Sequence, residues 1–221
     1  MEETAITLDG LRAGYGSTTV LHGITARVPR AQVTALTGHN GSGKSTLLGV
    51  LAGSLAPTAG TVERASARRP AVVFQRTEVP ATMPMSVREA VAMGRWAHRG
   101  WWRPLTRNDR AVAAHCMERL GVADLARTQL DRLSGGQYQR VLIAQGLAQE
   151  SDLILLDEPA AGLDHRARDR ILEIFDELAA DGVTVVHATH DDEAARRADH
   201  RLHLRDGRLA AGVREPADLA R

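Results

Sequence analysis

The segment from Val33 to Leu48 constrains the fold of this chain more than any other part of its sequence. It begins with a short apolar, β-branched run, passes through Gly38, four further residues and Gly43-Lys44-Ser45, and continues with a helical pattern. The order of strand, glycine-rich loop and helix is typical of proteins that bind nucleoside triphosphates. Glycines let the backbone curl so that successive N–H groups point at phosphate oxygens, and the helix N-terminus adds positive potential.

Side chains of this loop have separate predicted tasks. Lys44 is expected to contact the β- and γ-phosphates of ATP, and the Ser45 hydroxyl is expected to bind Mg²⁺. A glycine- and serine-rich surface turn is the alternative, but such a turn requires neither the lysine nor the flanking strand and helix. The residues predicted to surround the phosphates are Gly38, His39, Asn40, Gly41, Ser42, Gly43, Lys44, Ser45 and Thr46.

Composition and charge exclude several classes of protein. The 221 residues are 43% hydrophobic and 25% charged, as in an ordinary globular protein. A formal net charge of +1 gives no electrostatic argument for binding nucleic acid or an anionic membrane. Cys116 is the only cysteine, so no disulfide can form within the chain, and a reducing compartment is indicated. No secretory signal is recognised and no apolar run approaches the ~18 residues that span a bilayer, so any membrane role requires a partner's helices.

The predicted phosphate loop supports a functional interpretation of two isolated polar side chains. Tyr15 stands between two glycines and offers a flat face for a purine base, although a turn tyrosine with its hydroxyl in water is the alternative. Gln75 follows the short apolar strand expected at Ala71–Phe74. Its side-chain oxygen is a candidate Mg²⁺ ligand, and an ordinary strand-edge residue is the alternative.

Two later strands end in groups that suit catalysis. The apolar run Asp152–Leu156 leads to Asp157 and Glu158, and it fits a strand buried on both faces of a parallel sheet. Adjacent strand residues point to opposite sides, so one acid can serve the Mg²⁺ shell while the other acts on the attacking water. An acidic turn is the alternative. The segment Val183–His190 predicts a further strand, which ends in a histidine.

A second glycine-rich turn, Leu133–Gln137, opens another predicted helix. A helix N-terminus of this kind attracts anions, although a plain helix start is the alternative. One chain does not need two loops that grip the triphosphate of one nucleotide. The second loop therefore implies a partner chain.

The segment from Pro80 to about Leu130 has helical periodicity. Ser86 and Glu89 form a capping-box pattern, and Asn108 is predicted to cap the following long helix. The segment Trp96–Arg103 holds all three tryptophans among several cations. Ordinary packing is one interpretation of these tryptophans, and a docking patch for a partner, formed together with Met83–Val87, is the other.

Taken together, these motifs resemble the ATP-binding subunit of an ABC transporter over essentially the whole chain. Leu133-Ser134-Gly135-Gly136-Gln137 matches the signature loop of that family, and the motifs follow each other in the family's order. The resemblance implies an α/β P-loop NTPase fold with a RecA-like parallel-sheet core, an N-terminal antiparallel β part and an inserted α-helical subdomain. The single domain, 1–221, would comprise an ATP lobe, 1–74 and 132–221, and a helical subdomain at about 75–131. The segment Glu63–Pro70 is expected to be an exposed loop, leaving the antiparallel part reduced.

The resemblance also implies roles for individual residues. Tyr15 would stack on adenine, Asp157 would support Mg²⁺ together with Ser45 and Gln75, and Glu158 would be the general base. His190 would contact the γ-phosphate, and Lys44 and Gln75 would complete the catalytic set. The residues implied to grip or couple the ATP of a second subunit are Ser134, Gly135, Gly136, Gln137 and Asp164. Two ATP molecules would thus be sandwiched in a head-to-tail homodimer.

The helical segment is similar to that of ATPases from zinc and manganese importers, including zinc-uptake ATPases of the AztA type. The similarity rests on Gln75-Arg76, Pro84–Arg88, Val91–Arg95 and Asn108–Arg110. It implies import of zinc or manganese through polytopic permease subunits at the cytoplasmic side of the inner membrane, with a solute-binding protein as an indirect partner and no nucleic acid. Import of a siderophore or vitamin is the neighbouring alternative.

Two further classes of function are disfavoured. ABC ATPases of DNA repair or translation usually carry coiled-coil insertions or duplicated halves, and this chain has neither. A binding module without chemistry would not need Lys44, Asp157, Glu158 and His190 together. Departures from the common family pattern occur at His39, Tyr138 and Gln145, where we expect effects on partner contacts rather than on catalysis. The nine histidines have no spacing that predicts a zinc site in this chain.

Overall fold

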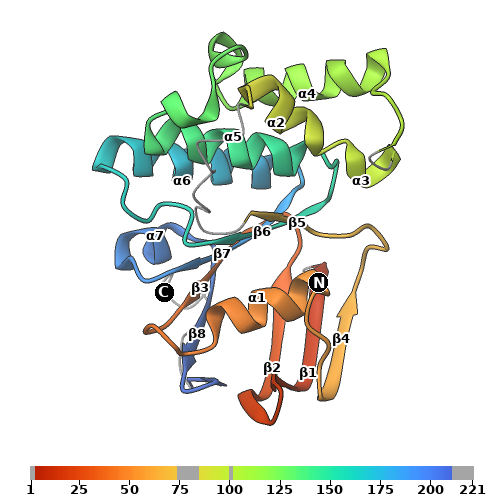
Figure 1. Cartoon of the computed structure of the whole chain (residues 1–221). Helices are drawn as coiled ribbons and strands as arrows, with labels where there is room; N and C mark the ends of the chain where they lie inside the picture. The colour runs from red at the N-terminus through yellow and green to blue at the C-terminus, as the bar shows by residue number, and fades with distance from the viewer. Residues whose placement is uncertain (1–2, 74–84, 100–101, 211–221) are drawn as a thin grey trace.

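A six-stranded sheet forms the centre of the molecule (Figure 1). The computed structural model describes residues 3–73, 85–99 and 102–210. The strand order is β5-β6-β7-β3-β8-β9, with parallel pairing throughout except between β8 and β9. These strands are β3 (Val33–Thr37), β5 (Ala71–Val73), β6 (Leu153–Asp157), β7 (Thr184–Thr189), β8 (His200–Arg205) and β9 (Arg208–Leu209). Because the strands are parallel, their carboxyl ends gather at one edge, where ligands of such sheets bind.

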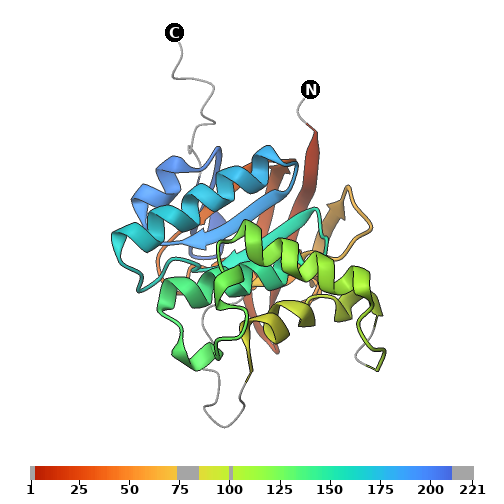
Figure 2. The same cartoon turned by 90° about the horizontal axis from the view of Figure 1, so that it is seen from above.

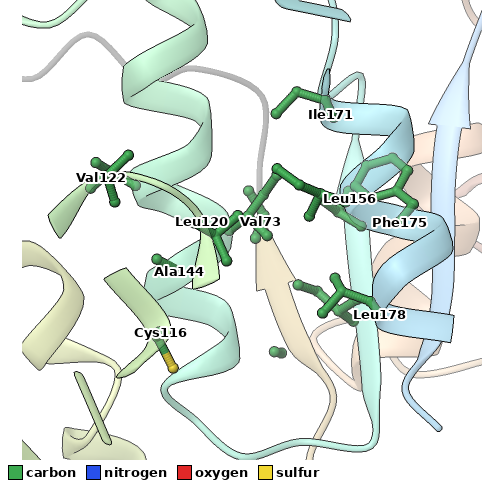
Figure 3. Close-up of a cluster of buried hydrophobic side chains, with 14 of the residues drawn as sticks. Val73, Cys116, Leu120, Val122, Ala144, Leu156, Ile171, Phe175 and Leu178 are labelled. Atoms are coloured by element: carbon green, nitrogen blue, oxygen red, sulfur yellow. The ribbon is translucent and has the colours of Figure 1, made fainter. Parts of the chain in front are cut away.

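Side-chain alternation along these strands divides the interior into two cores. On β6, Ile154 and Leu156 belong to one core, whereas Leu153 and Leu155 belong to the other. The first core lies under the helices that cover one face of the six-stranded sheet, and Figure 3 shows Leu156 and Phe175 meeting within it. The second core lies between the sheet, helix α1 (Lys44–Ala52) and a second sheet. Residues adjacent on a strand point to opposite faces, so the continuous apolar run of β6 serves both cores.

The second sheet is antiparallel and has three strands in the order β2-β1-β4. They are β1 (Thr4–Tyr15), β2 (Thr18–Pro29) and β4 (Ala59–Arg64). The expectation of an exposed loop over Glu63–Pro70 is therefore wrong at its start, because Glu63 and Arg64 belong to β4. The Arg64 Nε donates a hydrogen bond of 3.1 Å to the Leu51 carbonyl oxygen, which ties β4 to the last turn of α1.

Helices cover the face of the six-stranded sheet that carries the first core. Seen from above, α6 and α7 lie together on one side, whereas α2, α3 and α4 lie on the other, with α5 between them (Figure 2). The helices are α2 (Val87–Met93), α3 (Trp96–Arg99), α4 (Arg107–Arg119), α5 (Gly135–Leu147), α6 (His165–Ala180) and α7 (Asp192–Arg197), with 3-10 turns η1 (Ala123–Leu125) and η2 (Leu130–Arg132).

The N-termini of α2 and α4 show where the predicted caps were right and where they were not. The Ser86–Glu89 capping box is confirmed, since each side chain bonds the other residue's backbone N–H. Asn108 is not the cap of α4. The cap is Thr106, whose hydroxyl accepts from the Asp109 N–H at 3.1 Å while the Asp109 carboxylate accepts from the Thr106 N–H at 2.9 Å. A hydroxyl and an acid three residues apart satisfy two N–H groups, which Asn108 within the first turn could not do.

A buried guanidinium joins the helices to the central sheet. Arg95 Nε lies 3.1 Å from Asp109 Oδ1, and its Nη1 lies 2.6 Å from Glu150 Oε2. The same Nη1 donates to the Ala148 carbonyl oxygen at 2.8 Å. Arg95 therefore links the end of α2, the first turn of α4 and the connection from α5 to β6.

Candidate active site

The loop between β3 and α1 has the conformation expected of an anion cradle. Gly38, Gly41 and Gly43 have φ angles of 146°, 82° and 104°, in the region that favours glycine. A β-carbon at Gly38 would also collide with the carbonyl oxygen of Leu204. Gly43 is the N-cap residue of α1 and provides no side-chain cap, in contrast to the hydroxyl caps of α2 and α4. The first N–H groups of α1, which have no acceptor within the helix, are therefore available to an anion.

Two buried polar groups in this loop fit a bound phosphate. Lys44 is only 6% exposed, and its Nζ donates to the carbonyl oxygens of Gly38 at 2.8 Å and His39 at 3.4 Å. The Ser42 hydroxyl is buried and has no hydrogen-bond partner among the described residues. Buried polar groups are normally paired, so an unpaired hydroxyl beside a lysine indicates a place for an acceptor-rich ligand. Phosphate oxygens supply such acceptors.

Glu158 and His190 meet beside Lys44, at the ends of neighbouring strands. His190 Nδ1 lies 2.8 Å from Glu158 Oε2, and Lys44 Nζ lies 3.8 Å from Glu158 Oε1. The Glu158 side chain is 13% exposed and that of His190 is 63% exposed. Glu158 has a φ of 49°, unusual for a residue other than glycine, and its N–H donates to the Ala188 carbonyl oxygen at 3.1 Å. The β7 backbone thus holds Glu158 in a strained backbone conformation, and residues with such strain are often found at functional sites.

The predicted metal ligands lie near this group. Asp157 is the last residue of β6 and is half-buried, and Ser45 lies in the first turn of α1 with its side chain exposed. A hydroxyl and a carboxylate are oxygen donors of the kind that Mg²⁺ prefers, so the donor set fits this ion. Gln75, the third predicted ligand, lies outside the described residues.

Tyr15 ends β1 and is 59% exposed. Its backbone pairs with Thr18 across the β1–β2 turn, so the strand rather than a free loop carries the ring. The exposed face suits stacking on a planar ligand, as the sequence predicts.

The second glycine-rich loop is a capped helix start. The Ser134 hydroxyl accepts from the Gln137 N–H at 3.3 Å, and Gln137 Oε1 accepts from the Ser134 N–H at 2.9 Å. This capping box was not predicted from the sequence, although the Ser-x-x-Gln spacing is its signal. A β-carbon on Gly136 would stand 2.9 Å from the Ala167 β-carbon, so α5 and α6 approach closely there.

The signature loop and the phosphate loop line different cavities of this chain. Ser134, Gly136, Gln137 and Asp164 share a cavity of about 840 Å³ with residues of α6, and no phosphate-loop residue contributes to it. Asp164 is the N-cap of α6, and its Oδ1 accepts from the Ala167 N–H at 2.8 Å. The structure thus brings Lys44, Glu158 and His190 together and groups Ser134 with Asp164 elsewhere.

Asp191 is a positioning residue that the sequence analysis did not single out. Its Oδ1 accepts from the N–H groups of Glu193 and Ala194, and its Oδ2 lies 2.8 Å from Arg168 Nη1. Burial alone would raise the pKa of Asp191, but these hydrogen bonds and Arg168 together lower it. An aspartate before a helical pattern was the signal that could have found it. Asp191 fixes the start of α7 directly after His190.

The two segments predicted to form one docking face lie apart. Met85 accepts from the Leu130 N–H near the start of α5, whereas the His98 ring contacts the Gln149 carbonyl oxygen just beyond its end. Trp96 is 41% exposed and Trp102 is 77% exposed, whereas Met83 and Trp101 lie outside the described residues. Ser86 and Val87 are buried and Met85 packs against the core, so the exposed part of the predicted patch is the aromatic segment, and docking of a partner stays a prediction.

Two further features concern membranes and metals. In the part of the chain that the structure covers, no helix is both long and apolar enough to cross a bilayer. Across the same residues, no three side chains of histidine, cysteine, aspartate or glutamate gather as a metal site.

Comparison with known proteins finds many relatives. A family model described as "ABC transporter" matches residues 21–161. The ferric enterobactin transport ATP-binding protein FepC of Escherichia coli (strain K12) is 36% identical over 96% of this chain and 83% of its own. The manganese transport system ATP-binding protein MntA of Synechocystis sp. is 35% identical over 95% and 85%. The hemin import ATP-binding protein HmuV of Streptomyces coelicolor is 41% identical over 92% and 75%.

Solved structures of similar fold agree with these relatives. An inward-facing putative metal-chelate type ABC transporter superposes with a TM-score of 0.87 and 31% identity, covering 94% of this chain and 82% of that one. A dimeric bacterial ABC transporter cassette superposes with a TM-score of 0.77 and 26% identity, covering 92% and 96%.

Proposed function

Because the chain belongs to the ABC transporter family as an ATP-binding subunit of an importer, we propose that it powers uptake by hydrolysing ATP at two sites of a head-to-tail dimer. The single observation that carries this proposal is the contact of Lys44, Glu158 and His190 beside the glycine-rich loop. ABC ATP-binding subunits are ATPases, and this constellation supplies an anion grip, a base and a group that orients the base.

Hydrolysis is proposed to depend on positioning and charge. The loop N–H groups and Lys44 hold the phosphates, and Tyr15 stacks on adenine. Glu158 polarises the attacking water, since its carboxylate is largely shielded and held by the His190 ring at 2.8 Å. His190, more exposed, reaches the γ-phosphate and helps align the attacking and leaving oxygens.

The metal proposal concerns Ser45, Asp157 and Gln75. When bound, Mg²⁺ would offset charge on the transferring phosphoryl group. The Ser45 hydroxyl would hold it directly, and Asp157 would hold it through water. Gln75 would be a further oxygen ligand of Mg²⁺. It would lie where the ATP lobe, residues 1–74 and 132–221, meets the helical subdomain, residues 75–131, and would signal the state of one part to the other.

The dimer proposal accounts for the second glycine-rich loop. Ser134, Gly135, Gly136 and Gln137 of one copy would close over ATP held by the other, with Asp164 coupling the two sites. The separate cavities of the two loops support this assignment, since Ser134 and Gly136 do not line the cavity that Gly38 and His39 line. The similar bacterial cassette, which was solved as a dimer, is in keeping with this arrangement.

The cargo is proposed to be a metal ion or a metal chelate. The relatives are named for manganese, ferric enterobactin and hemin, and the similar transporter structure is described as a putative metal-chelate type. Zinc, which the resemblance of the helical segment favours, belongs to this class of cargo. Import of a siderophore or vitamin is equally supported. The partners would be permease subunits at the cytoplasmic side of the membrane and, indirectly, a solute-binding protein. Growth of a deletion strain on single metal sources would identify the cargo.

The decisive experiment replaces the proposed base. Glu158→Gln keeps the shape of the side chain and removes its charge, so Mg²⁺-dependent phosphate release should fall by about 100-fold or more. ATP should still bind, and it should convert the variant to a dimer in size-exclusion chromatography with light scattering. Adding Lys44→Ala should abolish both ATP binding and ATP-induced dimerisation. Parent-rate hydrolysis by Glu158→Gln would remove Glu158 as the base.

A further inference from the structure

A cavity of about 460 Å³ opens beside the phosphate loop, on the face of the sheet that α7 covers. Helix α7 connects β7 to β8, and both strands flank β3 in the sheet (Figure 1). A water molecule takes about 30 Å³ in the liquid, so the cavity has room for a hydrated small ion. The resemblance assigns no role to the residues of α7 and β8 that line it.

The alternation of β8 explains why cationic side chains line this cavity. Leu202 and Leu204 belong to the core beside α1, so Arg201 and His203 face the opposite side of the sheet. Both line the cavity. In the parallel register, Arg201 stands beside Ala35 and His203 beside Thr37. The His203 Nδ1 lies 2.9 Å from the Thr37 hydroxyl oxygen, which fixes that ring at the carboxyl end of β3.

The cavity holds an excess of positive charge. Arg196 of α7 and Arg201 line it, and among the described residues that line it Asp192 is the only one with a carboxylate. Throughout the described segments, neither of these two guanidinium groups forms an ion pair or a hydrogen bond. The neighbouring Arg197 differs, since its Nη2 lies 2.7 Å from Asp176 Oδ2. Two arginines that line one cavity and form no ion pair offer guanidinium donors whose geometry suits an oxyanion.

We propose that this cavity binds inorganic phosphate, the product of ATP hydrolysis, beside the reaction centre; the proposal rests on the ATPase function above. Gly38 and His190 line the cavity and also belong to the proposed γ-phosphate site, so the two sites are contiguous. A phosphate dianion that leaves ADP meets Arg196 and Arg201 next. Guanidinium groups bind phosphate oxygens through paired hydrogen bonds, which selects phosphate over a monovalent halide.

The test uses the full chain, loaded with ADP and titrated with inorganic phosphate in isothermal calorimetry. The double variant Arg196→Gln/Arg201→Gln should bind phosphate at least about 10-fold more weakly, because the anion loses two charged hydrogen-bond donors. The control Arg27→Gln/Arg127→Gln removes two exposed arginines that do not line the cavity and should bind phosphate like the parent. Sodium chloride of equal ionic strength should not displace phosphate.

A second measurement separates this proposal from the ATPase function. Added phosphate should inhibit ATP turnover by the parent, and the double variant should need at least about 10-fold more phosphate for the same fractional inhibition of its own turnover. Equal phosphate affinity in parent and double variant, or no phosphate binding by the parent, overturns the proposal. Absence of ATP hydrolysis by the parent would instead contradict the proposed function. If the double variant fails to fold, Arg196→Gln alone, at an exposed position, serves the same comparison.

Discussion

His187 is a buried histidine whose titration should make the fold sensitive to acid. It lies on β7 between the sheet and α6, with its ring centroid 5.2 Å from that of Phe175. Its Nε2 is buried and has no hydrogen-bond partner in the described part of the chain. Burial lowers the pKa of His187 from 6.5 to about 4, because the charged ring would lose its hydration. The folded protein therefore holds a neutral ring at pH values where the unfolded chain takes up a proton.

The sign and size of the effect follow from this difference. Well above pH 6.5 the His187 ring is neutral in both the folded and the unfolded protein, so the full stability is present. As the pH falls toward 4, only the unfolded protein binds a proton at this ring. Between pH 7 and pH 5 the free energy of unfolding should drop by about 2 kcal/mol from this residue alone, and by about 3 kcal/mol when the fall is complete.

The assay is urea unfolding followed by circular dichroism at pH 7 and pH 5. His187→Phe keeps an aromatic ring beside Phe175 and removes the titration, so its stability should fall by about 2 kcal/mol less than that of the parent over this range. The control His115→Gln, at an exposed position of α4, should follow the parent. An acid-induced loss in His187→Phe as large as in the parent would refute the assignment of the pH dependence to this ring.

Three further predictions concern packing, nucleotide binding and thiol reactivity. Arg95→Met should destabilise the protein by about 3–5 kcal/mol in urea unfolding, because it removes the guanidinium that pairs with the buried Asp109 carboxylate. Arg170→Met, at a partly exposed ion pair of α6, should cost less than about 1 kcal/mol, and equal losses would contradict the buried-pair argument. Tyr15→Ala should weaken ATP binding in fluorescence titration by about 5- to 100-fold and Tyr15→Phe should not, since stacking of a base contributes ~1–3 kcal/mol; an unchanged affinity would remove Tyr15 from the site. Burial raises the pKa of the Cys116 thiol to about 11. A thiol reagent at pH 7 should therefore label the protein only after unfolding, and rapid labelling of the native protein would count against this burial.

The central elements of the site were predictable because their signals are local. The order of strand, glycine-rich loop and helix is a local pattern, so the amino-acid order around residues 38–46 suffices to predict β3, the positive-φ glycines and α1, which the structure has. Hydrophobic periodicity likewise located β6 and β7 to within a residue, and thus placed Glu158 and His190 at strand ends. The capping box of α2 is a four-residue pattern, and it was equally visible.

Other features required the tertiary structure, because they depend on which strands are neighbours. Leu202 and Leu204 alternate with Arg201 and His203 along β8, which is a pattern visible in the sequence. Only the register of β8 beside β3 brings Arg201 and His203 to the glycine-rich loop. The strained backbone of Glu158 likewise depends on its bond to Ala188 of the adjacent strand.

By itself, the sequence determined the type of fold, the glycine-rich loop between β3 and α1 and the chemical identity of the groups at the strand ends, since short-range pattern and residue type suffice for these. Only the tertiary structure decided which of those groups meet. It placed Glu158 between Lys44 and His190, and it assigned Ser134 to a separate cavity. It also placed Arg196 and Arg201, which form no ion pair with a described residue, beside the proposed reaction centre. The physical reason is that distances between side chains depend on the order and register of strands, and residues far apart along the chain set both.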